Sequence, residues 1–97
     1  MITLETYDTE QGRMVASADT ALVGEVYKED GVRVDVDPEF YGKTAADRGD
    51  VMKALRGASI ANLVGEDAVE AGVDADIVDE ANVLRVDGVP HAQMVRL

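Results

Sequence analysis

Asp87-Gly88, set between Val86 and Val89 near the C-terminal end, restricts the fold of this chain more than any other dipeptide in it. A two-residue turn of type I′ requires positive φ angles at both central positions, and Asp-Gly adopts them readily. The chain is therefore expected to reverse direction here as a tight antiparallel hairpin, in which Val86 pairs with Val89.

The register of this hairpin assigns each side chain to one of two faces, because neighbouring residues on a strand point to opposite sides. Arg85 falls opposite Pro90 at a non-hydrogen-bonded position, so the missing N–H of Pro90 costs no hydrogen bond within the hairpin. The side of Pro90 that faces away from the hairpin partner is expected to be a sheet edge or a bulge. One face carries Asn82, Leu84, Val86, Val89, His91, Gln93 and Val95, and the other carries Val83, Arg85, Pro90, Ala92, Met94 and Arg96.

A second hairpin is predicted at the N-terminal end. Residues 2–7 alternate between two faces, and residues 13–17 can return as their antiparallel partner after an intervening polar stretch. Residues 32–37 alternate valine with charged residues in strict period two, which is typical of a strand. Asp19 is expected to cap a short helical turn at residues 21–23.

The longest predicted helix lies between the two hairpins. It spans residues 51–64, with Asp47 or Asp50 as its N-cap and Gly65 at its end. Residues placed at 100° intervals put Asn62 on the apolar stripe of this helix. The amide of Asn62 is therefore expected to point toward the interior with the apolar side chains.

A shorter helix is predicted over residues 66–71, with two acidic residues in its first turn and Gly72 at its end. The 97 residues contain no repeat, no low-complexity tract and no Pro/Gly/Ser linker. We therefore expect a single small domain spanning residues 1–97. Its predicted fold class is α+β, with N-terminal and C-terminal antiparallel β-hairpins packed on a central helix.

The composition excludes several classes of protein. A chain of this length buries only about 60–65% of its unfolded surface, which rules out a large multi-layer catalytic core. It has no cysteine and one histidine, which excludes a disulfide, a thiolate nucleophile and a multi-histidine zinc site within one chain. Two acidic sets lack the glycine and closing glutamate of an EF-hand loop and are expected to be solvated carboxylates: Asp35, Asp37 and Glu39, then Asp74, Asp76 and Asp79. We therefore predict no metal, no cofactor and no assigned catalytic residue.

The charge balance indicates a protein adapted to high salt concentration. It has 20 acidic against 9 basic residues, a net charge of −11, with three lysines against six arginines. Crowded carboxylates and scarce lysine are typical of salt-in halophiles, where molar salt shortens the Debye length to about 3 Å. We expect a haloarchaeal source, in which acidity does not argue against RNA binding; the alternative is a mesophilic acidic protein with a basic partner.

The chain is also expected to be cytoplasmic. No stretch approaches the roughly 18–20 consecutive apolar residues of a membrane helix. The N-terminus lacks the basic and then apolar order of a signal peptide. No membrane contact is therefore predicted, and the sequence does not predict an oligomeric state.

Three strings occur in order along the chain: Glu39 to Gly42, Ala58 to Gly65 and Gly88 to Gln93. In this order and at these intervals they resemble the small archaeal domain-of-unknown-function family 424, over nearly the whole chain. The family pattern often has a second glycine after Gly42 and another before Gly88, where this chain has Lys43 and Asp87. The resemblance implies an α+β fold and an archaeal cytoplasmic protein with no assigned activity.

Two polar side chains on apolar faces are the strongest site candidates. His91 is the one side chain whose ordinary pKa lies near neutrality, as general acid or base catalysis requires. Asn62 must find hydrogen-bond partners or lose roughly 1–3 kcal/mol to desolvation. Each also has a structural interpretation, as a half-buried hydrogen-bonded histidine and as an amide that caps the hairpin backbone. Converging with Gln93 and Tyr41, they would form a polar pocket able to hydrogen-bond a base or an amide.

Arginines and tyrosines suggest a second type of contact. Arg85 and Arg96 share one face of the C-terminal hairpin, and Tyr7, Tyr27 and Tyr41 offer stacking surfaces. Arginine beside an aromatic platform is a common way to hold single-stranded RNA. No known RNA-binding motif accompanies them, so this is a hypothesis from residue chemistry alone.

The function that we predict is a non-catalytic binding module in archaeal information processing, such as translation, that contacts RNA or a ribonucleoprotein. The binding residues are His91, Asn62, Gln93, Tyr41, Arg85 and Arg96. One alternative is a small enzyme that uses His91 as general acid or base and Asn62 as a polarising amide. Another is a protein–protein adaptor that uses the apolar end of the helix, with Ile60, Leu63 and Val64.

Overall fold

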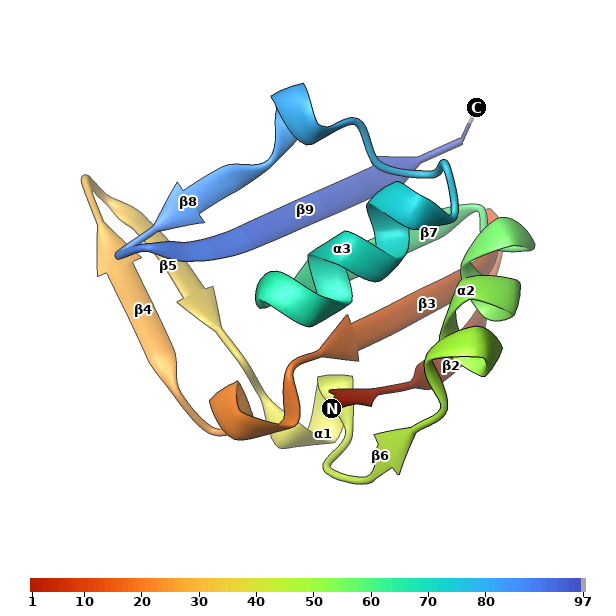
Figure 1. Ribbon diagram of the computed structural model, residues 1–97, viewed down its shortest axis with the longest axis horizontal. Coiled ribbons are helices and arrows are strands. Elements are labelled where there is room, and N and C mark those ends of the chain that lie inside the picture. Colours follow the sequence, from red (N-terminus) through yellow and green to blue (C-terminus); the bar gives the residue numbers. More distant parts are fainter. Residues whose placement is uncertain (97) are drawn as a thin grey trace.

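A computed structural model describes residues 1–96 of the chain. It consists of short strands, three of them consecutive at the N-terminal end, and short helices (Figure 1). The strands are β1 (Ile2–Thr3), β2 (Glu5–Thr9), β3 (Gly12–Ala18), β4 (Val26–Glu29), β5 (Val32–Asp35), β6 (Ala45–Ala46), β7 (Ile60–Val64), β8 (Leu84–Val86) and β9 (Val89–Val95). The helices are α1 (Pro38–Tyr41), α2 (Arg48–Arg56) and α3 (Glu66–Asp74), with 3-10 turns η1 (Thr20–Leu22) and η2 (Glu80–Asn82).

A five-stranded mixed sheet organises these elements in the order β2-β3-β7-β9-β8. Strands β3 and β7 run parallel, and the other neighbours run antiparallel. Helices α2 and α3 cover one face of this sheet (Figure 1). The predicted α+β class, with hairpins β2–β3 and β8–β9 from the two ends of the chain, is confirmed. Among residues 1–96, no helix is long and apolar enough to cross a membrane.

The C-terminal hairpin has the predicted register. Val86 pairs with Val89 and Arg85 with Pro90, and the turn residues Asp87 and Gly88 have φ angles of 51° and 81°. On its outer side Pro90 lies just beyond the end of the ladder with β7, whose last pair is Val64 with His91, so no β7 residue needs the missing N–H. Gly65, which follows β7, donates its N–H to Pro90 O at 2.9 Å. Asn82 lies in η2 rather than on the hairpin face, which corrects its predicted position.

The largest correction concerns the helix predicted over residues 51–64. Helix α2 ends at Arg56, and residues 60–64 form β7, the middle strand of the sheet. Leu63 and Val64 are both 0% exposed, because the helices cover one face of β7 and a second apolar cluster covers part of the other. A short apolar run buried on both faces has no period-two alternation and resembles a buried helix end. Of the three side chains in the adaptor alternative, Leu63 and Val64 are consequently inaccessible to a partner, whereas Ile60 is half-buried.

Two helix boundaries also differ from the prediction. Helix α3 does not end at Gly72 but continues to Asp74. The glycine is needed at this position because the helix approaches the side chain of Leu63 closely there. Asp19 precedes η1 but makes no side-chain cap there; its carboxylate accepts hydrogen bonds from the first turn of α3 instead. Asp47 is confirmed as the N-cap of α2, because its Oδ1 accepts the N–H of Gly49 at 2.7 Å, but the helix starts at Arg48 and not at residue 51.

The second face of the sheet is only partly covered. Hairpin β4–β5 and helix α1 pack beneath it through Val34, Val36 and Tyr41, which contact residues of β3, β7 and β8. At the tip of the β4–β5 hairpin, Glu29 Oε1 accepts the N–H of Asp87 in the β8–β9 turn at 2.6 Å. The ribbon shows the β4–β5 hairpin running from the region of α1 toward that turn (Figure 1). The opposite end of the same sheet face has no covering element among the described residues.

Candidate functional site

The uncovered part of the sheet carries a row of side chains that crosses four strands. Asn62 on β7 lies directly across from Gln93 on β9, and Gln93 Nε2 donates to Asn62 Oδ1 at 3.0 Å. Asn62 Nδ2 contacts Met14 Sδ on β3 at 3.7 Å. Met14 in turn lies across from Tyr7 on β2. We call Tyr7, Met14, Asn62 and Gln93 the cross-strand row.

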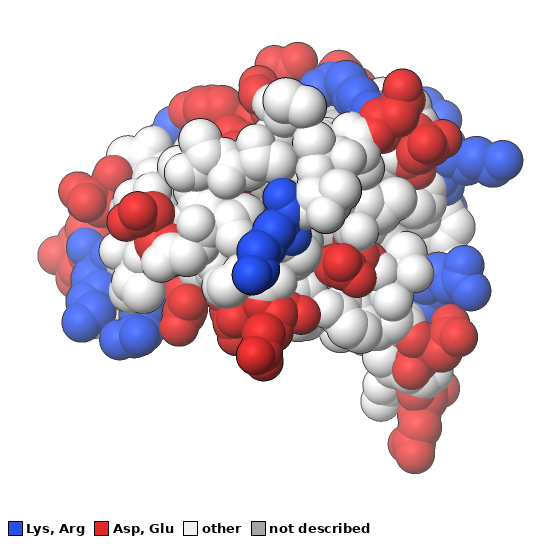
Figure 2. Space-filling model, turned by 90° about the horizontal axis from the view of Figure 1, so that it is seen from below, with Lys and Arg blue, Asp and Glu red and all other residues white. Residues whose placement is uncertain are grey.

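An aromatic stack closes one end of the cross-strand row. The rings of Tyr7 and Phe40 are 5.5 Å apart and nearly parallel, at 6°. The hydroxyl of Tyr7 donates to Phe40 O at 2.6 Å, which fixes the tyrosine against α1. Figure 2 shows the molecule hollowed at lower right, on the side of the sheet away from α2 and α3. Phe40 and Met14 could not be identified from the sequence, because their role depends on which elements are neighbours in the fold.

The amides of the row keep hydrogen-bonding capacity for a ligand. A primary amide has two donors and an acceptor oxygen with two lone pairs. The bond between Asn62 and Gln93 uses one donor of Gln93 and one lone pair of Asn62. Gln93 is exposed and Asn62 is half-buried, so the remaining groups of Gln93 face solvent. The predicted convergence of Asn62 with Gln93 therefore occurs, although Asn62 reaches it from a strand and not from a helix.

His91 lies on the same sheet face, two residues before Gln93. It is half-buried between Leu84 on β8 and Val64 on β7, and this burial lowers the pKa of its imidazole. The neutral form therefore dominates near pH 7. Ser17 would be a possible nucleophile for His91, but its hydroxyl donates to Thr3 O at 2.6 Å and is fully buried. The serine lies on the helix-covered side of β3, away from His91.

We expect acidification from about pH 7.5 to about 5.5 to reduce the free energy of unfolding, and His91→Gln to remove part of that loss. Because burial lowers the pKa of His91, the unfolded chain binds a proton in this range that the folded chain binds only at lower pH. The stabilisation is complete above the unfolded pKa and decreases as the pH falls through it. Urea unfolding followed by circular dichroism at constant KCl measures both proteins. Parallel pH profiles for the two would contradict this assignment.

Tyr41 is a core residue rather than a surface for stacking. It is 5% exposed, packs edge-on against Phe40 at 4.9 Å, and belongs to the apolar cluster beneath the sheet. Burial raises the pKa of Tyr41 to about 12, with a smaller contribution from the charge of Asp35. The aromatic side chain within the row is that of Tyr7, which is half-buried and lies across from Met14 in the register of β2 and β3.

The two arginines predicted to act together lie in different environments. Arg85 faces the helix-covered side, and its guanidinium donates to Glu66 Oε1 at 2.8 Å. This hydrogen bond raises the pKa of Arg85 and lowers the pKa of Glu66. Arg96 follows β9, and its guanidinium reaches the carbonyl of Arg56 at the end of α2, at 3.4 Å. Both arginines therefore lie on the helix-covered side, opposite to Asn62 and Gln93, with Arg96 at the strand end next to α2.

Arg96 is part of a group of cations at the C-terminal end of α2. Arg13 and Lys53 line a hollow of about 340 Å³ beside Gly57, and Arg56 lies one residue before that glycine. Figure 2 shows Lys and Arg side chains gathered along the right of the molecule, on the side of α2. We call Arg13, Lys53, Arg56 and Arg96 the basic cluster. It adjoins the strand ends at which β3 and β7 begin and β9 ends.

Four carboxylates of the two acidic sets have hydrogen-bond or ion-pair partners within the fold: Asp35, Asp37, Asp74 and Asp79. Asp37 Oδ1 accepts the N–H of Glu39 at the start of α1, and Asp79 Oδ1 accepts the N–H of Ala81 at the start of η2. Asp74 forms an ion pair with Arg48 at 2.6 Å. Over residues 1–96, no group of three or more side chains has the arrangement needed to hold a metal ion. These carboxylates cap and pair elements of the fold.

Comparisons with known proteins relate the chain to others in both sequence and fold. A family model described as "Protein of unknown function (DUF424)" matches residues 7–97. The crystal structure of an uncharacterized conserved protein from Methanopyrus kandleri is 25% identical, with a TM-score of 0.80. The likeness covers 99% of this chain and 94% of that chain. No curated protein matches at a significant level.

Proposed function

The chain belongs to the family of unknown function DUF424, as its sequence strings suggested, and from this premise we propose that it is a non-catalytic module that binds single-stranded RNA. The RNA, free or within a ribonucleoprotein, would lie on the uncovered face of the sheet. The observation that carries the proposal is the amide pair Asn62–Gln93 on the same open face as the Tyr7–Phe40 stack.

The chemistry of the cross-strand row suits unpaired bases. Sequence-specific RNA recognition commonly stacks a base on an aromatic ring and hydrogen-bonds its edge. Tyr7 offers the ring, and the amides of Asn62 and Gln93 offer both donors and acceptors to a base edge. Met14 fills the space between them with a polarizable apolar side chain. These groups lie on neighbouring strands, so several contacts could be made without rearranging the backbone.

The basic cluster would contact phosphates where the RNA passes around the strand ends, because its side chains lie with α2 on the helix-covered side of the sheet. Arg13 is also paired with Asp8 at 3.4 Å. Cations positioned beside a stacking platform are typical of single-strand binding surfaces. The net charge of −11 opposes RNA at low salt, but molar salt limits that repulsion to a Debye length of about 3 Å. A salt-rich archaeal cytoplasm and a role in translation are parts of this proposal. His91 would act as a neutral hydrogen-bonding neighbour of the row rather than as a catalytic acid.

We expect the double substitution Asn62→Ala with Gln93→Ala to weaken RNA binding at least tenfold. A good base-edge contact is worth about 1–3 kcal/mol, and 1.4 kcal/mol corresponds to a factor of ten. Fluorescence anisotropy with a labelled pool of random single-stranded RNA, in molar KCl, measures the affinity. Gln11→Ala is the matched control, because it removes an exposed amide from the β2–β3 turn, outside the row.

Two results would reject the proposal. One is the absence of binding by the wild-type protein to the RNA pool in both low and molar KCl. The other is equal affinity of the double variant and the wild type, with circular dichroism confirming that both are folded. A double-stranded RNA of the same composition should compete poorly, because its bases are paired and unavailable for stacking.

A further inference from the structure

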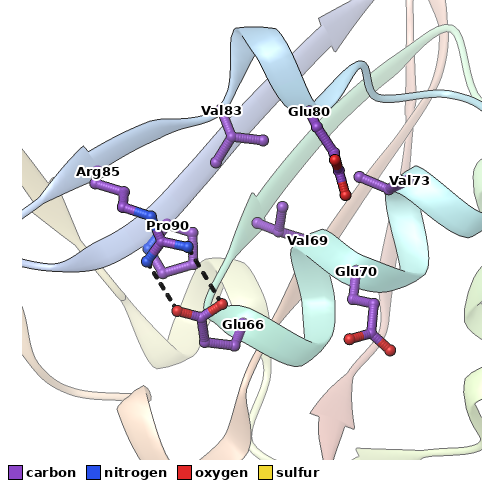
Figure 3. A pocket seen from close by; sticks show the side chains of 8 residues that line it. All are labelled: Glu66, Val69, Glu70, Val73, Glu80, Val83, Arg85 and Pro90. Atoms are coloured by element: carbon purple, nitrogen blue, oxygen red, sulfur yellow. Dashed lines mark hydrogen bonds and ion pairs between the residues drawn. The ribbon is translucent and has the colours of Figure 1, made fainter.

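A groove on the other side of the molecule has a chemistry different from that of the cross-strand row. It has a volume of about 540 Å³ and lies between α3 and the strand β8 at the edge of the sheet (Figure 3). Its floor consists of four apolar side chains, Val69, Val73, Val83 and Pro90. Val69 is only 6% exposed, so the floor is continuous with the core beneath α3.

Carboxylates form the rim of this groove. Glu66 and Glu70 project from α3, and Glu80 projects from η2 on the opposite side (Figure 3). Arg85 is the one cation among the lining residues, and both of its terminal nitrogens reach Glu66, at 2.8 and 3.5 Å. In Figure 3 this ion pair spans the end of the groove above Pro90. The groove is therefore bounded at that end and carries a net negative charge.

The other two glutamates keep charge for a ligand. Glu70 shares the guanidinium of Arg48 with Asp74, at 3.3 and 2.6 Å, so one cation serves two carboxylates. Glu80 forms no ion pair among the residues that the structure describes, and it is exposed. Glu80 is thus the rim carboxylate without an ion pair, whereas in Figure 3 the carboxylate of Glu70 points away from the valine floor, on the side where it pairs with Arg48.

We propose that this groove binds a short basic segment of a partner protein, with an aliphatic side chain on the valine floor and lysine or arginine on the glutamate rim. An apolar centre with a charged rim is the usual anatomy of a protein interface. A polar small molecule would instead require convergent hydrogen-bonding groups in the floor. The floor offers none, and the described residues contain no buried, unpartnered side-chain N or O atom.

The groove and the cross-strand row occupy opposite faces of the sheet. Pro90 and Arg85 face the helices, whereas Gln93 and Asn62 face away from them. A protein segment and an RNA strand could therefore occupy the molecule together. The two proposals are independent, and each can fail without the other.

Selection from a library of randomised short peptides tests the groove. The wild-type protein is the bait, at the lowest KCl concentration at which circular dichroism shows it folded, because screening weakens contacts with exposed charges. We expect the selected peptides to combine Lys or Arg with at least one aliphatic residue. The double variant Glu70→Lys with Glu80→Lys should bind them at least tenfold more weakly.

The matched control carries the same change of charge at a distant place. Glu10→Lys with Glu25→Lys reverses two exposed carboxylates, one in the β2–β3 turn and one before β4, and should retain wild-type peptide affinity. Failure to enrich basic aliphatic peptides would overturn the proposal, as would equal weakening by the two double variants. RNA binding should be unaffected or strengthened in the Glu70→Lys, Glu80→Lys variant, so the result separates this site from the sheet face.

Discussion

Leu63→Ala is expected to lower the free energy of unfolding by about 2–5 kcal/mol. Leu63 is 0% exposed in the middle strand β7 and packs in the core beneath α2 and α3. Removing its side chain deletes buried apolar contacts and leaves a cavity that the surrounding strands fill only partly. Leu84→Ala is the matched control, because Leu84 is 48% exposed and its loss should cost less than about 1 kcal/mol. Urea unfolding followed by circular dichroism measures both.

A double-mutant cycle tests the specific contact between β7 and α3. A Cβ atom on Gly72 would lie 2.5 Å from Leu63 Cδ1 and 3.0 Å from Val78 Cγ2, so Gly72→Ala is expected to destabilise the protein by overpacking, by about 1–3 kcal/mol. In the Leu63→Ala background that clash with leucine disappears. The combined cost should therefore be smaller than the sum of the two single costs. Additive costs would contradict the packing of Gly72 against Leu63.

Asp19→Ala is expected to lower the free energy of unfolding by about 1–2 kcal/mol. The N-cap position of α3 is Gly65, which has no side chain to accept the free N–H groups of the first turn. Asp19, at the end of β3, accepts them instead: Oδ1 bonds the N–H of Ala68 at 2.9 Å and Oδ2 the N–H of Asp67 at 3.3 Å. The substitution leaves both donors without this partner. Thermal and urea unfolding at fixed KCl measure the loss.

Asp19→Asn separates hydrogen bonding from charge. Burial raises the pKa of Asp19, and the bonds from Ala68 and Asp67 oppose that shift in part. Asparagine keeps an acceptor oxygen and carries no charge to desolvate, so its cost should be smaller than that of alanine. Equal losses for the two variants would mean that the acceptor oxygen does not cap α3. Gly65 must also remain glycine, because a Cβ there would collide with the Asp19 carboxylate.

The candidate site was partly predictable from the sequence. The alternation of residues in the C-terminal hairpin placed His91 and Gln93 on one face, and the pairs of β8 and β9 confirm it. Asn62 was recognised as an amide that needs a partner, and Gln93 is that partner. Tyr7 and Phe40 were not recognised as a stacked pair. They lie 33 residues apart along the chain, and no local pattern indicates that β2 and α1 meet.

The sequence by itself determined those features that depend on neighbours along the chain. Asp87-Gly88 specifies a turn through its φ angles, and that turn sets the register of β8 and β9. Asp47 caps α2 because its carboxylate reaches an N–H two residues ahead. These interactions close over a few residues, so residue type and spacing are sufficient to predict them.

Three features were decided only by the tertiary structure. They are the strand conformation of β7, the capping of α3 by the distant Asp19, and the two proposed binding surfaces, the cross-strand row and the glutamate-rimmed groove. Residues 60–64 become a strand because β3 and β9 lie on either side of them, and β3 is more than 40 residues distant. A short apolar run buried on both faces has no periodicity that separates strand from helix. Its conformation is fixed by hydrogen bonds to distant strands. For the same reason the cross-strand row and the glutamate-rimmed groove exist only once the sheet has formed.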